Sequence, residues 1–171
     1  KAADIDLILV EPRTNSIKDE VFLGKTSGKI IKQTQIPALI VPEGEVFKPI
    51  KHILMAIKSA IIKKKNVLQP LKYIKDQFKA DADLLLVKTP YYNEDDFKLN
   101  NDLQALISNT IHSENATTFQ GVLEHYHTTK PDMLCVVRRK RGFFIKKWEK
   151  NVILKKDFNS NIPVLVLSGL K

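Results

Sequence analysis

A glycine, a lysine and two hydroxyl side chains stand together at Gly24, Lys25, Thr26 and Ser27. This group is typical of the end of a phosphate-binding loop, where glycine lets the backbone approach phosphate oxygens that lysine and hydroxyl groups then bind. A P-loop also requires a glycine five positions earlier, where this chain has Asp19. Because an aspartate lacks the freedom of glycine and repels phosphate, we do not expect a P-loop. Two hypotheses stay open: these residues hold a phosphate, or Thr26 or Ser27 caps a helix.

A compact basic cluster at Arg138, Arg139, Lys140 and Arg141 follows an apolar run. At the end of a strand such a cluster fits contact with phosphate or RNA. No aromatic side chains interleave with it to stack bases, so a solvated loop is the simpler interpretation and we do not expect a nucleic-acid partner. The net charge of +9 does not decide between ligands, because the lysines are spread over most segments.

Three of the four histidines, His112, His125 and His127, fall in the second half of the chain. We expect 125–127 in a short helix, where side chains two positions apart diverge, and no Cys or carboxylate stands at a metal-ligand spacing. No catalytic triad or carboxylate pair can be argued either, so we predict no metal site and no enzyme. The lone Cys135 lies in an apolar run and is expected to be a buried hydrophobe.

The composition supports one folded domain of ordinary size and part of another. The chain has 171 residues, of which 43% are apolar, enough for a hydrophobic core. No apolar run approaches the roughly 18 residues that span a bilayer, and the N-terminus lacks the layout of a signal peptide. We therefore expect a soluble cytoplasmic protein without a membrane partner.

Short apolar runs alternate with segments of helical period, which predicts an α/β domain with a parallel sheet. The predicted strands are residues 5–10, 38–41, 52–57, 84–88, 117–122, 133–137 and 164–167. The predicted helices carry three apolar stripes, namely Val67, Leu71, Ile74 and Phe78; Leu99, Leu103, Leu106, Ile107 and Ile111; and Ile145, Trp148 and Val152.

Two segments recur in register. Residues 6–10 resemble 132–136, residues 35–41 resemble 161–167, and both pairs have one offset, since 132 minus 6 and 162 minus 36 each give 126. We therefore interpret residues 1–44 as the C-terminal part of a first copy, a β-α-β remnant, and residues 50–171 as a complete second copy.

With these motifs the sequence resembles the universal stress protein family, in its tandem two-domain form. The resemblance rests on the strand at 6–10, the glycine and hydroxyl segment at 24–27, the closing strands entered through Pro37 and Pro163, and the opening strand at 49–57. It implies a doubly wound, five-stranded parallel sheet with helices on both faces, similar to adenine-nucleotide hydrolases, and a ligand site where strand order reverses.

Family members that bind nucleotides have an Asp after the first strand and a series of three glycines after the fourth. The resemblance places Glu11 and Thr14 at the first two glycine positions of the first copy and keeps only Gly24 at the third. Lys25, Thr26 and Ser27 follow it and could still hold an anion.

In the second copy the glycine positions carry Val137, Lys140 and Lys150, and Lys58 replaces the Asp. We therefore expect a degraded nucleotide site there, while ATP stays open as a ligand of the first copy.

The resemblance also implies association through the last strand of each copy, where two such strands pair antiparallel. An edge strand of this kind has unpaired backbone groups unless it is covered. The expected function is a non-catalytic stress-response binding or signalling module that forms an internal or intermolecular domain dimer, with a homo-oligomer as the expected assembly. The alternatives are ATP binding by the first copy and a basic module that binds RNA or phosphate. The residues of the predicted contact are Ala38, Leu39, Ile40 and Val41 with Val164, Leu165, Val166 and Leu167.

Overall fold

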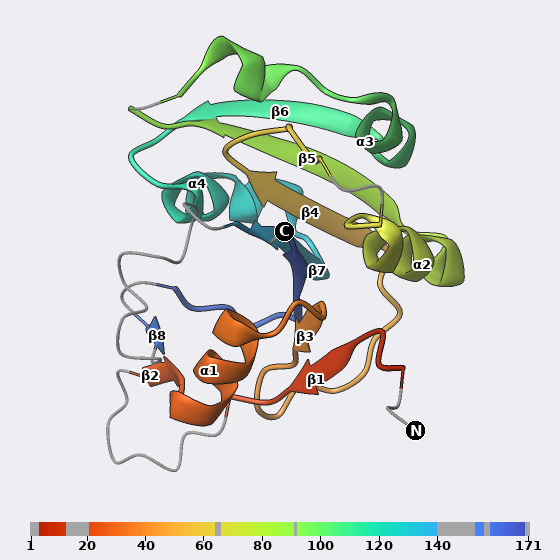
Figure 1. Cartoon of the computed structure of the whole chain (residues 1–171), viewed down its shortest axis with the longest axis vertical. Helices are drawn as coiled ribbons and strands as arrows, with labels where there is room; N and C mark the ends of the chain where they lie inside the picture. Colours follow the sequence, from red (N-terminus) through yellow and green to blue (C-terminus); the bar gives the residue numbers. More distant parts are fainter. Residues whose placement is uncertain are drawn as a thin grey trace.

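Five parallel strands within residues 50–171 and two strands within residues 1–44 form one seven-stranded sheet (Figure 1). We use second copy and first copy below as labels for these two segments. The computed structural model describes residues 4–12, 21–63, 66–90, 92–139, 153–155 and 158–169. The strand order is β1-β3-β9-β7-β4-β5-β6, and the only antiparallel contact within this described sheet joins β3 to β9. The predicted five-stranded parallel sheet is therefore confirmed, and the two strands of the first copy extend it.

The second copy contains most of the regular structure. Its strands are β4 (His52–Ile57), β5 (Asp81–Lys88), β6 (Asn109–Glu114), β7 (Met133–Arg138) and β9 (Val164–Ser168). Its helices are α2 (Gln69–Phe78), η1 (Glu94–Phe97), α3 (Asn101–Leu106) and α4 (Thr118–Thr129). The short β8 (Ile153–Leu154) pairs with β2 of the first copy in a separate two-stranded sheet.

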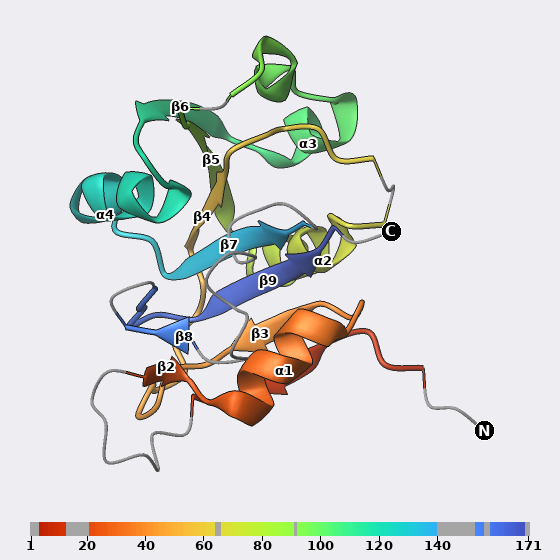
Figure 2. The same ribbon diagram turned by 60° about the vertical axis from the view of Figure 1, so that its left-hand side comes forward.

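The first copy contains β1 (Ile8–Val10), β2 (Val21–Leu23), α1 (Lys25–Gln33) and β3 (Ala38–Ile40). In the turned view of Figure 2, α1 lies beside β3, and β3 lies next to β9. The strands β1 and β3 are parallel and are joined through α1, which matches the β-α-β unit expected from the sequence.

Helices cover both faces of the sheet. The central strands have apolar side chains on both faces, and these are buried only when helices pack on each side. On one face, Ile31 of α1 and Val122 of α4 pack with the side chains of one core cluster. On the other face, Leu71 and Ile74 of α2 and Leu103 of α3 pack in a second cluster. Strands buried on both sides need apolar residues at consecutive positions, as in residues 53–57 of β4 and 133–137 of β7.

Two predicted elements were wrong. The segment 117–122, expected as a strand, begins α4, where the Thr117 side chain caps the helix by accepting a hydrogen bond from the Gln120 backbone. The helix expected to reach Ile111 ends at Leu106, because the chain turns into β6 at Asn109. The third apolar stripe, at 145–152, lies outside the described residues.

Helix α4 lies unusually close to β5 at Gly121. A Cβ atom at this position would lie 2.7 Å from Cγ2 and 3.3 Å from Cγ1 of Val87, which is buried in the sheet. We therefore expect Gly121→Ala to lower the free energy of unfolding by about 1–2 kcal/mol, since the cost of overpacking exceeds the gain in helix propensity.

Chemical denaturation with a matched control checks this prediction. Leu123 lies on the same helix and is 53% exposed, so Leu123→Ala should change the free energy of unfolding by less than about 0.5 kcal/mol. Equal stability of Gly121→Ala and the unmodified chain would contradict the close approach.

Candidate functional site

The strand order reverses between β4 and β7. From β4 the chain continues to β5 and β6 on one side, whereas β7 and β9 lie on the other. In open α/β sheets, ligands bind beyond the carboxyl ends of the two strands at such a reversal. Lys58 follows β4 and Arg139 follows β7, so these two residues stand where a ligand of the second copy would lie.

Described residues occupy part of this position. Nη2 of Arg139 donates a hydrogen bond of 2.6 Å to the backbone oxygen of Ser59, which ties the segment after β7 to the segment after β4. A cavity among the described residues there, lined by residues that include Lys58, Thr118 and Arg139, has a volume of about 20 Å³. Small-molecule sites usually measure roughly 300–1,000 Å³, so this cavity has room for about one water molecule.

Burial lowers the pKa of Arg139, and the carboxylate of Asp96 acts in the opposite direction. A guanidinium group nevertheless stays charged in proteins. The charged Arg139 side chain therefore points into the protein, where it bonds to a backbone oxygen and interacts with a nearby acidic side chain.

The Arg138 side chain is also directed into the protein. It is 5% exposed, and its guanidinium group donates hydrogen bonds to the backbone oxygens of Ile31 and Thr34. These oxygens lie at the carboxyl end of α1, where helical carbonyl groups lack partners and a positive charge is favourable. Burial lowers the pKa of Arg138. The residue thus joins a strand of the second copy to a helix of the first.

The other two residues of the basic cluster, Lys140 and Arg141, lie outside the described residues, as do Thr14 and Lys150. The structure places the two described arginines of the cluster against backbone oxygens. A phosphate or RNA contact by this cluster therefore stays a prediction that concerns Lys140 and Arg141.

Gly24 stands at the start of α1. It is the N-cap residue, with φ of −71°, and the helix begins at Lys25. Neither Thr26 nor Ser27 caps the helix as expected, because both lie within its first turn, and Ser27 Oγ instead donates to the backbone oxygen of Glu11 at 3.4 Å. Within the described residues, α1 has neither a side-chain cap nor an acidic residue in its first turn. This helix terminus favours an anion.

The two closing strands lie side by side in the sheet. β3 pairs antiparallel with β9, with Leu39 opposite Leu165 at the centre of the contact. The flanking pairs are Ala38 with Val166 and Ile40 with Val164. Leu165 is fully buried, whereas Leu39 is partly exposed. Val41 follows β3 and donates its backbone N–H to Val10, and Leu167 belongs to β9.

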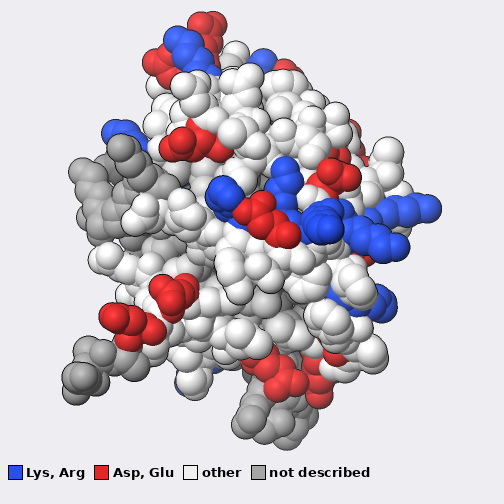
Figure 3. Space-filling view, turned by 90° about the vertical axis from the view of Figure 1, so that its right-hand side faces the viewer, with Lys and Arg blue, Asp and Glu red and all other residues white. Residues whose placement is uncertain are grey.

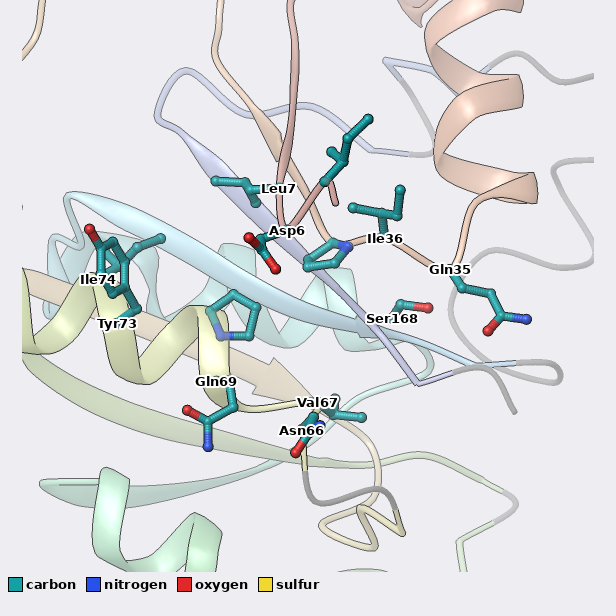
Figure 4. Close-up of a pocket in the computed structure, with 13 residues that line it drawn as sticks. Asp6, Leu7, Gln35, Ile36, Asn66, Val67, Gln69, Tyr73, Ile74 and Ser168 are labelled. Atoms are coloured by element: carbon teal, nitrogen blue, oxygen red, sulfur yellow. The ribbon is translucent and has the colours of Figure 1, made fainter. Parts of the chain in front are cut away.

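A cleft of about 890 Å³ opens between the two copies on the α2 side of the sheet. Figure 4 shows Asp6, Gln35 and Ser168 on one side of this cleft and Gln69 and Tyr73 of α2 on the other. Ser168 Oγ is buried without a hydrogen-bond partner among the described residues. The residues lining the cleft are Ile5, Asp6, Leu7, Gln35, Ile36, Pro37, Asn66, Val67, Gln69, Pro70, Tyr73, Ile74 and Ser168.

A smaller cleft of about 430 Å³, which sequence reasoning missed, lies at the carboxyl ends of β5 and β6. The Tyr92 and Phe97 rings meet edge to face there, and His112 stacks on Phe97. The ammonium of Lys88 lies 4.5 Å from the centre of the Tyr92 ring and 2.7 Å from Glu114 Oε1. The aromatic residues at 91, 92 and 97 were the only signal of this cluster in the sequence.

The other sequence candidates contribute no described site. His125 and His127 lie on α4, and no cluster of three metal-ligating side chains exists in the part of the chain that the structure describes. Cys135 is fully buried, and desolvation raises the pKa of its thiol well above the usual range. No helix among the described residues is long and apolar enough to cross a membrane.

No protein-family model and no curated protein matches the chain. Solved structures do match it. A universal stress protein from Archaeoglobus fulgidus matches with a TM-score of 0.62 and 15% identity over 96% of this chain and 62% of its own.

Two proteins from Pseudomonas aeruginosa give similar results. One is of unknown function, with a TM-score of 0.60 and 11% identity, and the other is a candidate universal stress protein, with 0.58 and 12%. Each match covers 95% of this chain and 63% of the other. The chain therefore spans less than two thirds of these proteins, and it has the fold of the universal stress proteins.

Proposed function

We propose that this chain belongs to a tandem universal stress protein and acts as a non-catalytic binding or signalling module in a cytoplasmic stress response. Residues 1–44 would be the C-terminal part of a first domain, and residues 50–171 a complete second domain. The antiparallel contact of β3 with β9 would join the two domains, in the manner of an internal dimer.

The observation that carries the proposal is the narrow space between the described ends of β4 and β7. The hydrogen bond from Arg139 to Ser59 and the cavity of about 20 Å³ beside it support a second copy without a nucleotide, as far as the described residues form this position. The extended contact between the copies, by contrast, is built from complementary apolar strands, with Leu165 fully buried. Association of the two copies through β3 and β9 therefore explains this geometry better than nucleotide binding does.

A second candidate function is anion or ATP binding by the first copy. It is favoured by the start of α1, where Lys25 and Thr26 are exposed and the described residues provide no acidic group in the first turn. Backbone N–H groups at a helix N-terminus attract phosphate. Gly24 would allow the phosphate to approach the backbone closely.

Thermal unfolding with and without Mg²⁺ and ATP tests both candidates. A ligand at a hundred times its Kd stabilises by about 2.7 kcal/mol, which would raise Tm by roughly 5–10 °C in a chain of this size. We expect no rise in Tm from binding of ATP to the second copy. Inorganic sulfate at equal ionic strength serves as the control for non-specific anion effects.

Two variants locate any binding that occurs. If ATP raises Tm and Lys25→Ala removes the effect, the first-copy candidate is supported. If Lys58→Ala removes the effect and Lys25→Ala does not, the second copy binds nucleotide and the proposal is wrong. Both lysines lie outside the buried core, so neither variant should unfold the chain.

A further inference from the structure

One part of the sheet has no helix over it on the α2 side among the described residues. Side chains alternate along a strand, and since Ile8 and Val10 pack in the cluster with α1, Leu7 and Leu9 point to the α2 side. Leu9 is 69% exposed and Ile5 is 55% exposed. Leu7 and Leu39 are partly buried at the margin of the α2 cluster, and we call Ile5, Leu7, Leu9 and Leu39 together the uncovered face. Figure 3 shows the side of the molecule on which α2 lies in Figure 1, with most of the basic side chains in a band across the middle and white surface with separate acidic groups below it.

The matching positions of the second copy show what covers such a face. The offset of 126 that relates residue 6 to 132 also places Met133, Cys135 and Leu165 at the positions of Leu7, Leu9 and Leu39. All three are 0% exposed. They pack in one cluster with Leu71 and Ile74 of the amphipathic helix α2. The same strand positions are therefore fully buried in one copy, whereas in the other Leu9 is exposed and Leu7 and Leu39 are only partly buried.

The edge of the sheet shows the same difference. Ile8 donates its N–H to Pro37 and Val10 accepts from Val41, so both face β3 and the backbone groups of Leu9 face outward. Among the described strands, β1 pairs with β3 alone. In the second copy, the matching edge of β7 pairs in parallel with β4, with Met55 opposite Cys135.

The unit that completes the second copy is thus a single piece of chain, β4 followed by α2. It both pairs with the edge of β7 and covers the face of β7 and β9. The cleft of about 890 Å³ lies between part of this face, Ile5 and Leu7, and residues of α2.

We infer that the edge of β1 and the uncovered face bind a strand-helix unit, with its strand parallel to β1 and the apolar side of its helix on Leu7, Leu9 and Leu39. This inference rests on the proposed two-copy organisation but not on the absence of nucleotide from the second copy. Its partner is defined chemically: a short apolar strand followed by an amphipathic helix of the α2 type.

Hydrogen exchange tests the inference on the chain as it stands. The probe is a synthetic peptide of residues 50–80, which contains the β4-α2 unit that covers the matching face of the second copy. We expect the outward-facing amide of Leu9 to exchange at least tenfold more slowly when the peptide is present at saturation. Leu9→Asp should abolish that protection, while Ile30→Asp, on the partly exposed side of α1, should leave it unchanged.

Three results would overturn the inference. They are an unchanged Leu9 exchange rate with the peptide, equal protection in the Leu9→Asp variant, and protection of Leu9 without peptide in a species that sedimentation shows to be a dimer. The last result would assign the face to a second copy of this chain. A negative result with the peptide does not change the result expected from thermal unfolding with ATP. The two proposals can therefore be tested separately.

Discussion

Replacement of Arg138 by methionine is expected to lower the free energy of unfolding by about 3 kcal/mol. The guanidinium group is buried and donates to the backbone oxygens of Ile31 and Thr34, at the end of α1. Hydrogen bonds to charged groups contribute about 1.5–3 kcal/mol each, and loss of the arginine leaves carbonyl groups without a partner. Methionine retains much of the apolar stem, so the loss reports mainly on the hydrogen bonds. Urea denaturation followed by circular dichroism measures the effect.

A surface cation of the same helix provides the control. Lys29 of α1 is exposed, and Lys29→Met should change the free energy of unfolding by less than about 0.5 kcal/mol. Exchange of α1 amides should also become faster in Arg138→Met, since the contact joins this helix to the second copy. Unfolding of Arg138→Met at the same urea concentration as the unmodified chain would show that the arginine does not hold the two copies together.

Replacement of Leu165 by aspartate is expected to have the larger effect, a loss of about 5 kcal/mol or complete unfolding. Leu165 is fully buried, lies opposite Leu39 of β3, and pairs on its other side with Cys135 of β7. Loss of a buried leucine alone costs about 2–5 kcal/mol, and an unpaired carboxylate in the interior adds to that cost. Thermal unfolding and the soluble yield of the purified chain measure the outcome.

Two further variants make this result interpretable. Leu165→Ile conserves volume and should lower the free energy of unfolding by less than about 1.5 kcal/mol. Leu39→Asp should weaken the same strand contact from the side of the first copy, where the leucine side chain is partly exposed. If either aspartate variant stays folded with β3 still paired to β9, the contact between the closing strands does not hold the copies together.

The strands that could be predicted best are those buried on both faces. β4 agrees with its predicted bounds, and β7 and β9 agree to within one residue, because a continuous apolar run between polar residues leaves little choice. The predictions failed where local propensity and tertiary context disagreed. β-branched Thr117 and Thr118 favoured a strand, yet the Thr117 side chain caps a helix that packs on β5 through Gly121. Ile111 fitted a helical spacing but lies in β6.

The candidate site could be predicted only in part. The position of Lys58 after β4 followed from strand order, since the carboxyl ends of parallel strands share one edge. The roles of Arg138 and Arg139 did not, because their partners Ile31 and Ser59 are separated from them by 107 and 80 positions in the sequence. A cluster of basic residues has the same appearance in a sequence whether it faces solvent or caps a helix. A degraded site at the reversal point was expected from Lys58 and the missing glycines, but the hydrogen bond from Arg139 to Ser59 was not.

The central claim is that the two copies form one sheet through β3 and β9, and amide hydrogen exchange tests it most directly. Pro37 and Val41 bond to β1, so the amides of Ala38 and Ile40 face β9 and pair with Val166 and Val164. We predict that these two amides exchange as slowly as those of the central strands β4 and β7. Exchange of Ala38 and Ile40 at the rate of an unstructured peptide, while β4 and β7 stay protected, would contradict the account.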